Sequence, residues 1–284
     1  MIRLGTRPSR LAIIQAKMVS EKIIALTNEE VKIVPVTTEG DLSGKLGINL
    51  KSAFTKRLED AITNGSVDAA VHSLKDFPLQ SMEGLALVSF PISQDPSDYL
   101  ITDSGAGLFE LKSGAAIGTG SVRRKSLIEF YRPDVTVQPL RGNVDSRVKK
   151  YRELGMDGVV LSGAGVIRLG LNVGYKRLDP EFFIPAACQG IIAVETKEGS
   201  RIAMLMKTIN DNWAEIRARA ERAFLETLGG DCNIPAGIYT RTCNGMICLK
   251  GFIASNKSIK FSVMKGMIKN AEDVGIELAG ELLH

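Results

Sequence analysis

The sequence AAIGTGSVRR at residues 115–124 decides the fold class, because it leads from a short apolar strand through a glycine-rich loop into a helix. Residues 115–117 predict the strand. Val122, Leu127 and Tyr131 predict one face of the following helix. A strand that passes into a helix in this way is the repeating unit of α/β domains with mostly parallel sheets. We therefore expect residues 115–131 to form one such unit.

The same alternation continues on both sides of this stretch. Before it, the sequence predicts strands at 2–5, 31–37 and 67–71, and helices at 54–62 and after the N-cap residue Ser9. The helix after Ser9 has Leu11, Ile14 and Met18 on one face. After the stretch, a strand at 135–138, a helix striped by Val144, Val148, Tyr151 and Leu154, and a buried strand at 157–161 are expected. The first two thirds of the chain thus indicate an α/β architecture.

The C-terminal part, residues 210–284, has a different pattern. A helix is expected at 212–228, closed by Gly229 and Gly230. The turn Asn244-Gly245 between apolar runs at 239–242 and 247–253 is a hairpin signature. A further strand at 258–264 and a helix at 271–283 complete a small α+β domain.

Length and composition restrict the possible functions. The chain has 284 residues, which favours two or three domains, and its net charge is +4 with 6% aromatic residues. A nucleic-acid binder usually shows a stronger basic excess with interleaved aromatics, so small acidic ligands are the better expectation. No signal peptide precedes the first strand, and no apolar stretch reaches the ~18 residues of a membrane span. We expect a cytoplasmic protein with no membrane partner.

Cysteine and histidine usage gives no sign of a metal site. The cysteines are scattered without a C-x-x-C pair, and histidine occurs only at positions 72 and 284. A structural zinc site is therefore not expected, and the cysteines lack a secreted disulfide pattern. The four cysteines are Cys188, Cys232, Cys243 and Cys248.

Arginines recur where a predicted strand gives way to a helix. A cation at a helix N-terminus opposes the helix dipole by roughly 0.3–1 kcal/mol, so the recurrence suggests a bound anion. The planar guanidinium suits carboxylates, and α/β proteins bind ligands at the carboxyl ends of their strands. For any single arginine, an ordinary surface ion pair remains the alternative. The set is Arg7, Arg123, Arg124, Arg141, Arg147 and Arg168.

The sequence VHSLKDFP at residues 71–78 takes a buried strand directly into polar residues, and a proline ends it. Asp76, ionised at neutral pH, could stabilise a developing cation or move a proton. Alternatively, Asp76 is a turn residue paired with Lys75, and His72 is a satisfied core residue. These eight residues alone leave both interpretations open.

The sequence LGGDCNIP at residues 228–235 would present Cys232 on a loop, as a nucleophile or an attachment point. The neighbouring Asp231 disfavours a thiolate, which weakens the nucleophile interpretation. Cys243 and Cys248 flank the predicted hairpin turn and are expected to be packing residues.

Seven motifs, in order, resemble the porphobilinogen deaminase family over residues 5–235. No single motif would be specific, but the ordered set is. The motifs are GTRPS (5–9), HSLKDFP (72–78), GTGSVRR (118–124), LRGNV (140–144), AGVIRLG (164–170), PAACQG (185–190), and ERAF (221–224) with GDCNIP (230–235).

The resemblance implies an α/β fold of two lobes like those of periplasmic binding proteins, with mostly parallel sheets, plus a small α+β C-terminal domain. The implied domains are residues 1–91 with 190–209, residues 92–189, and residues 210–284. The implied enzyme is a monomer without metal or nucleotide. It condenses four porphobilinogens, each losing ammonia, on its own dipyrromethane primer, and hydrolysis then releases hydroxymethylbilane.

The resemblance also assigns roles to residues. It implies that Asp76 is catalytic, stabilising a positively charged azafulvene and handling pyrrole N–H protons, and that Cys232 holds the primer by a thioether. The implied cofactor-binding residues are Ser73, Lys75, Thr119, Ser121, Arg123 and Arg124. The implied substrate-binding residues are Arg7, Ser9, Arg141, Arg147, Arg168 and Gln189.

The chain departs from the family pattern at several positions. Arg10 replaces a frequent proline, Gly120 a usual hydroxyl residue, and Cys188 and Asp231 each a glycine. Residues 46–53 lack the usual glycine-rich lid sequence, although Lys51 and Phe54 are retained. These departures bear on the lid and on substrate affinity more than on the activity.

Two other functions are compatible with parts of the pattern. A two-lobed binding protein for a small polycarboxylate would use the same arginines but would not need Cys232. A nucleic-acid binder would bind DNA or RNA with salt-sensitive affinity, yet few aromatic residues accompany the arginines.

Overall fold

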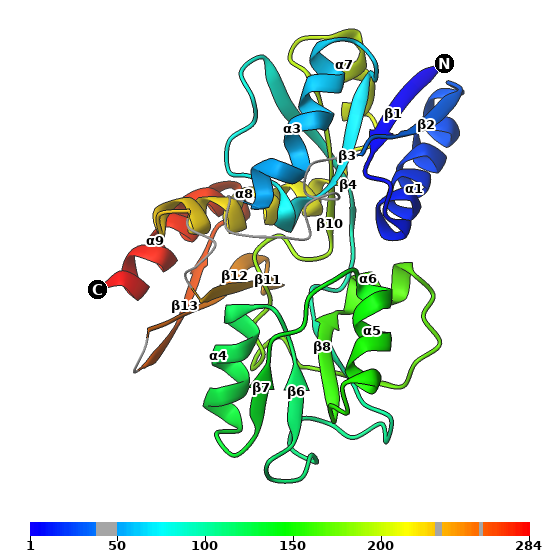
Figure 1. Ribbon diagram of the computed structural model, residues 1–284. Helices are drawn as coiled ribbons and strands as arrows, with labels where there is room; N and C mark the ends of the chain where they lie inside the picture. The colour runs from blue at the N-terminus through cyan, green and yellow to red at the C-terminus, as the bar shows by residue number, and fades with distance from the viewer. Residues whose placement is uncertain (38–49, 231–234, 256–257) are drawn as a thin grey trace. The chain divides into compact units, whose positions relative to one another are not determined.

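The computed structural model describes residues 1–37, 50–230, 235–255 and 258–284, and for 50–54 the backbone alone. The chain divides into two compact units, residues 1–94 with 190–218 and residues 95–189 with 219–284. Figure 1 shows the elements of both units. Each unit is built around a five-stranded sheet, and the second also contains a three-stranded sheet.

The first unit has the strand order β2-β1-β3-β10-β4. β1 pairs in parallel with β2 and β3, whereas β10 pairs antiparallel with β3 and β4. Helix α1 packs with α7 against one apolar layer, and α3 packs against the other. The bounds are β1 Ile2–Thr6, α1 Arg10–Thr27, β2 Val31–Pro35, α3 Leu50–Thr63, β3 Ala69–Ser73, the 3₁₀ turn η1 Leu74–Asp76, β4 Leu85–Ser93, β10 Ile191–Lys197 and α7 Arg201–Lys207.

The second unit has the strand order β7-β6-β8-β5-β9. β6 pairs in parallel with β7 and β8, and β5 pairs antiparallel with β8 and β9. The bounds are β5 Asp98–Ile101, β6 Ala116–Gly118, α4 Val122–Tyr131, β7 Thr136–Gln138, α5 Val144–Glu153, β8 Gly158–Ser162, α6 Gly163–Arg168 and β9 Tyr175–Arg177.

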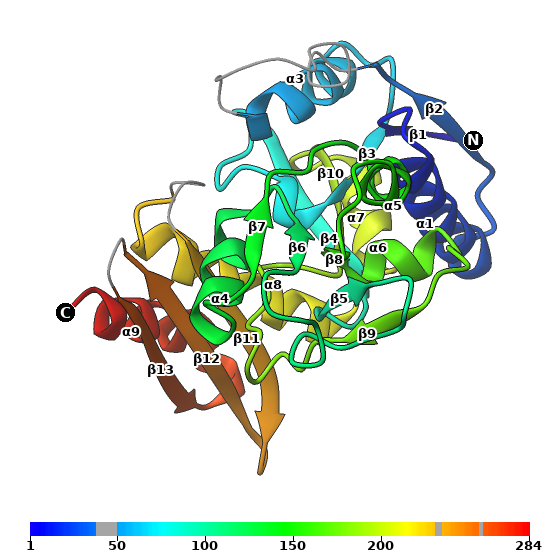
Figure 2. The same cartoon turned by 60° about the horizontal axis from the view of Figure 1, so that its bottom comes forward.

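The small C-terminal sheet is an antiparallel meander, β11-β12-β13, packed against α9 (Figure 2). Phe252 of β12 joins the apolar core of the second five-stranded sheet, which includes Leu100 and Leu127. The bounds are α8 Asn212–Thr227, β11 Ala236–Cys243, β12 Met246–Ala254, β13 Ile259–Gly266, the 3₁₀ turn η2 Ile268–Asn270 and α9 Ala271–Leu283.

The predicted α/β class with a small C-terminal domain is confirmed, but the large sheets are mixed rather than mostly parallel. The antiparallel pairs involve β5 and β10, the first strands after the chain passes from one unit to the other at 94/95 and 189/190. These strands do not follow a helical crossover within their own sheet, so nothing requires them to run parallel.

The sheet-facing side of α1 differs from the expected one. Gln15, Ala16 and Val19 are buried there, whereas Leu11 and Ile14 are only half-buried. Ala16 and Val19 belong to the apolar core of this sheet, and Gln15 is bonded to Ser73 at the end of β3. None of the described helices is long and apolar enough to cross a membrane.

Candidate functional site

In the first unit, the parallel strands bring several predicted residues to one edge of the sheet. Arg7 and Ser9 follow β1, and Ser73, Lys75 and Asp76 end or follow β3. Because β1 and β3 run parallel, their carboxyl ends lie at the same edge. The topology therefore groups these five residues as the sequence predicts.

Two serines at this edge are held by neighbouring groups. The Ser9 side chain caps α1 by accepting a hydrogen bond from the Ala12 N–H at 3.4 Å. Ser73 Oγ lies 2.8 Å from Nε2 and 3.0 Å from Oε1 of Gln15. Gln15 was not predicted as a site residue. Its signal in the sequence is a polar residue on an otherwise apolar helix face.

The turn η1 presents Asp76 to solvent. Leu74 and Phe77 are buried on either side of it, and the Phe77 N–H donates to the Leu74 carbonyl at 3.1 Å. The turn is therefore anchored by two apolar side chains, while Lys75 is half-buried and Asp76 is exposed. A carboxylate in this position is hydrated and accessible to a ligand.

A buried polar pair, His72 and Glu195, lies next to this turn. Nε2 of His72 on β3 is 3.2 Å from Oε2 of Glu195 on β10, and both side chains are buried. His72 also packs edge-on against Phe77, with ring centroids 4.8 Å apart. Burial, followed by the charge of Glu195, raises the pKa of Glu59 on α3. The prediction of His72 as a satisfied core residue agrees with this geometry.

In the second unit, the parallel strands β6, β7 and β8 likewise place their carboxyl ends at one edge. Thr119 and Ser121 follow β6, and Ser121 caps α4 by accepting from the Arg124 N–H at 3.4 Å. Arg141 follows β7, and Arg168 ends α6 after β8. Sequence and topology therefore agree on where these residues lie.

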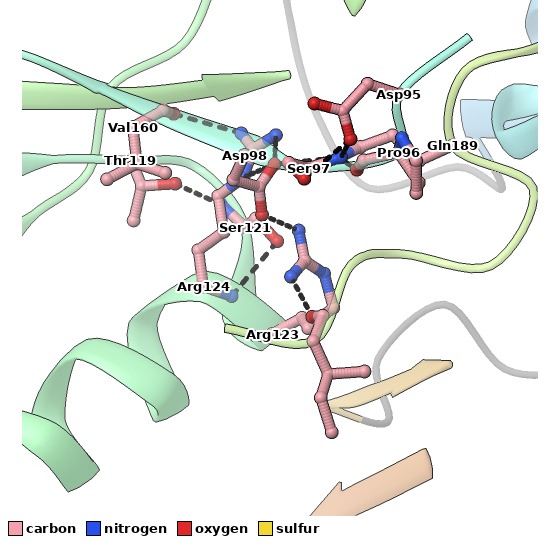
Figure 3. Close-up of polar contacts among 11 residues, drawn as sticks. Asp95, Pro96, Ser97, Asp98, Thr119, Ser121, Arg123, Arg124, Val160 and Gln189 are labelled. Atoms are coloured by element: carbon pink, nitrogen blue, oxygen red, sulfur yellow. Dashed lines mark hydrogen bonds and ion pairs between the residues drawn. The ribbon is translucent and has the colours of Figure 1, made fainter. Parts of the chain in front are cut away.

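Arg123 and Arg124 lie on the buried face of α4 and share one carboxylate, that of Asp98 on β5 (Figure 3). Arg123 Nη2 donates to Oδ2 at 2.6 Å. Arg124 donates to Oδ1 from Nη2 at 2.8 Å and from Nε at 3.1 Å. An anion was expected at the start of α4. The protein supplies one anionic group there itself, the carboxylate of Asp98.

The charges of this cluster do not balance. Among the described residues, two guanidinium groups face one carboxylate, so one positive charge of this cluster is left over in a buried position. Burial alone would raise the pKa of Asp98, but Arg123 and Arg124 hold that pKa well below its usual range. Nε of Arg123 is buried and has no hydrogen-bond partner in the described part of the chain. Both features fit a site that is completed by an anion.

Gln189 belongs to the same cluster. Its side chain is fully buried, and Nε2 donates to Asp98 Oδ1 at 2.9 Å and to the Pro96 carbonyl at 2.5 Å. The resemblance implies a substrate-binding role for Gln189, and the structure shows its amide bound to Asp98. Asp98 is not among the predicted site residues, because a lone aspartate gives no sign of a partner 25 residues away.

The remaining predicted arginines differ in environment. Arg141 is exposed. Arg147 Nε donates to the Gly142 carbonyl at 2.6 Å, which closes the first turn of α5. Burial lowers the pKa of Arg168 to about 10, so this residue is still a cation at neutral pH.

The cysteines fall into three groups. Cys232, with Asp231, lies outside the described residues, as do residues 46–49 of the lid segment, and only the backbone is described for residues 50–53. Cys243 and Cys248, expected to be packing residues, form a disulfide across the β11–β12 hairpin, with Cα atoms 6.0 Å apart. Cys188 is buried, and its φ of 62° is in the left-handed region, where glycine is favoured.

The fold and the arginine-bearing strand ends define an α/β protein equipped to hold an anionic ligand. Two family models match the chain: "Porphobilinogen deaminase, dipyromethane cofactor binding domain" over residues 2–204 and "Porphobilinogen deaminase, C-terminal domain" over residues 215–284. The chain therefore belongs to the porphobilinogen deaminase family. It is a hydroxymethylbilane synthase, a transferase of tetrapyrrole biosynthesis with a dipyrromethane cofactor.

Curated relatives match along the whole chain. The porphobilinogen deaminase of Carboxydothermus hydrogenoformans is 42% identical over 288 residues, covering 98% of this chain and 92% of the relative. That of Syntrophotalea carbinolica is 37% identical over 290 residues, covering 99% and 92%. These matches support the deaminase over the alternative of a binding protein.

Among solved structures, substrate-binding domain 2 of Lactococcus lactis GlnP in an open conformation aligns with a TM-score of 0.45 and 14% identity. The alignment covers 78% of this chain and 91% of that one.

Proposed function

We propose that Asp76 is the catalytic residue of this deaminase and that the basic residues at the strand ends hold the carboxylates of the dipyrromethane and of the growing chain. The observation that carries the proposal is the uncompensated positive charge of the Arg123–Arg124–Asp98 cluster. The proposed cofactor-binding residues are Ser73, Lys75, Thr119, Ser121, Arg123 and Arg124. The proposed substrate-binding residues are Arg7, Ser9, Arg141, Arg147, Arg168 and Gln189.

Asp76 has the chemistry that the condensation requires. Each addition would form a carbon–carbon bond between two pyrrole units. The carbon–nitrogen bond of the incoming porphobilinogen breaks with release of ammonia, and the attacked pyrrole carbon loses its hydrogen as a proton. Loss of the amine leaves positive charge on the pyrrole, which a neighbouring carboxylate stabilises. The same carboxylate accepts a hydrogen bond or a proton from the pyrrole N–H. Its exposure on a turn with two buried apolar anchors leaves it accessible while fixing the backbone that carries it.

The arginines supply the opposite charge. Pyrrole units with two carboxylates each make the chain more anionic at every addition, so binding requires several cations at different positions. Arg123 and Arg124 offer a buried charge at the start of α4, and Arg141 offers an exposed one after β7. A guanidinium binds a carboxylate through two parallel hydrogen bonds, which gives orientation as well as affinity.

Cys232 is proposed to anchor the dipyrromethane by a thioether, on the basis of its motif. The cofactor supplies the pyrrole carbon to which the first porphobilinogen adds. An anchor needs no thiolate after the bond has formed, so the acidic neighbour Asp231 is compatible with this role.

The remaining expectations are proposed on the same basis. They are a monomeric cytoplasmic enzyme with porphobilinogen as its substrate, and a division into three domains at residues 1–91 with 190–209, 92–189 and 210–284.

The deciding experiment is the intact mass of the purified protein with peptide mapping around residue 232. We expect a covalent addition of two pyrrole units on Cys232, present as purified or formed after incubation with porphobilinogen. Cys232→Ser should carry none, whereas the control Cys188→Ala should carry it normally. An adduct on another cysteine would refute the anchor assignment, and no adduct in any form would contradict the proposed cofactor attachment.

A further inference from the structure

We propose that Asp98 is a positioning residue of the catalytic apparatus, which holds Arg123 and Arg124 in their ligand-binding orientation although its negative charge opposes an anionic ligand. This inference rests on the proposed role of the two arginines. It goes beyond that role because it assigns Asp98 an action through the two arginines, to which it is bound.

Several elements of the second unit meet at the carboxylate of Asp98. Asp98 on β5 accepts from both arginines of α4 and from Gln189, which immediately precedes the return into the first unit at residue 190. All four side chains are buried. A single residue thus fixes three separate parts of the chain at the carboxyl edge of the sheet.

Each of the two guanidinium groups is held from two sides. Besides Asp98, Arg123 Nη1 donates to the Ile184 carbonyl at 2.6 Å, and Arg124 Nη1 donates to the Val160 carbonyl at 3.0 Å. Figure 3 shows the carboxylate between the two arginines. A guanidinium planar group bound at two points cannot rotate, so the direction of its remaining N–H groups is set.

Asp98 also sets the charge of the cluster. Without Asp98, two adjacent buried cations would repel each other, and each would keep only its bond to a backbone carbonyl, that of Ile184 or of Val160. With Asp98, the cluster keeps one net positive charge, and Nε of Arg123 lacks an acceptor among the described residues. The cluster is therefore held in one geometry and still attracts an anion.

The inference can be separated from a simpler one in which Asp98 only reduces the charge of the site. Asp98→Asn makes the cluster more positive but weakens its hold on both guanidinium groups. If charge alone mattered, this variant would capture the anionic primer at least as well as the unchanged protein. If Asp98 acts by positioning the two guanidinium groups, primer capture and porphobilinogen turnover should both fall in Asp98→Asn, although the cluster is more positive.

The experiment compares the unchanged protein, Asp98→Asn and Asp98→Glu after incubation with porphobilinogen. The fraction with covalent primer is measured by intact mass, and kcat and KM are measured on the primed fraction. Asp98→Glu keeps the charge and moves the carboxylate by one methylene, so a role in charge alone predicts normal behaviour for it. The matched control is Asp103→Asn, the same chemical change at an exposed aspartate that pairs with Arg152.

We expect both Asp98 variants to lose about tenfold or more in turnover, with a smaller primed fraction, while Asp103→Asn stays normal. Circular dichroism and the Tm identify folded variants, and Asp98→Glu decides the matter if Asp98→Asn does not fold. Primer capture and turnover at or above normal in either folded variant would overturn the role of Asp98. An unchanged protein that captures no primer would instead contradict the proposed cofactor attachment.

Discussion

His72 Nε2 lies 3.2 Å from Glu195 Oε2, although 123 residues separate the two in the sequence. The antiparallel pairing of β3 and β10 sets Ala193 opposite His72 and Glu195 opposite Ala70, so His72 and Glu195 are diagonal neighbours on one face. Glu59 of α3 is close enough for Glu195 to contribute to its raised pKa. The sheet register thus creates a buried cluster of two carboxylates and an imidazole behind the turn that carries Asp76.

We expect Glu59→Gln to raise the Tm at neutral pH and to have less effect in acid. Burial raises the pKa of Glu59, so its native-state contribution to stability is present below the ordinary glutamate pKa and is lost as the pH rises through the higher native pKa. Glutamine cannot ionise, so the Glu59→Gln variant does not lose this stability as the pH rises. Thermal unfolding between about pH 4 and pH 8 tests this, with the exposed Glu277→Gln as a control. A Tm difference independent of pH would contradict it.

Asp76→Ala should fold normally, carry any primer already attached, and turn over porphobilinogen at least about a hundredfold more slowly. Asp76 is exposed, and the anchors of its turn are Leu74 and Phe77, so its loss costs little stability. Single-turnover assays on the primed protein would measure this loss. Normal turnover would remove Asp76 from the mechanism.

Arg124→Ala should mainly lower the free energy of unfolding, whereas Arg141→Ala should mainly weaken substrate binding. Arg124 is buried and paired with Asp98, so removing it leaves a buried carboxylate short of a partner and should cost about 3–5 kcal/mol in the free energy of unfolding. Arg141 is exposed, and its removal should change that free energy by less than about 0.5 kcal/mol while raising KM. Urea unfolding and steady-state kinetics distinguish the two, and equal unfolding free energies would contradict this assignment.

Cys188→Gly should be close to neutral for stability, whereas Cys188→Val should be destabilising by more than about 1 kcal/mol. At a φ of 62° glycine relieves the strain of a side chain, which offsets the buried surface it loses. A β-branched residue adds strain in the same position. Thermal unfolding of the two variants checks the order, and a valine variant as stable as the glycine variant would show that this backbone is not strained.

The predictions that succeeded from sequence rest on local chemistry. Alternating runs of apolar residues and helix caps predicted the α/β units, and the structure confirms the cap at Ser9 through the hydrogen bond from Ala12. Glycine-rich loops placed Thr119 and Ser121 after β6, because strand, loop and helix start are consecutive in the chain. The ordered motifs indicated the family, which the full-length relatives confirm.

The sequence by itself indicated the strand–helix units around the motifs, the family and the positions of the basic residues at the strand ends, because these depend on runs of neighbouring residues. It did not predict β4, β5 or β10. Only the tertiary structure decided what those residues contact. Asp98 meets Arg123, Arg124 and Gln189 because β5 enters the second sheet beside β8, antiparallel to it. The large sheets are mixed for the same reason: β5 and β10 enter their sheets after the chain has passed from one unit to the other. Pairings of this kind join strands that are far apart in the chain, and the pattern of neighbouring residues does not show which distant strand is the partner.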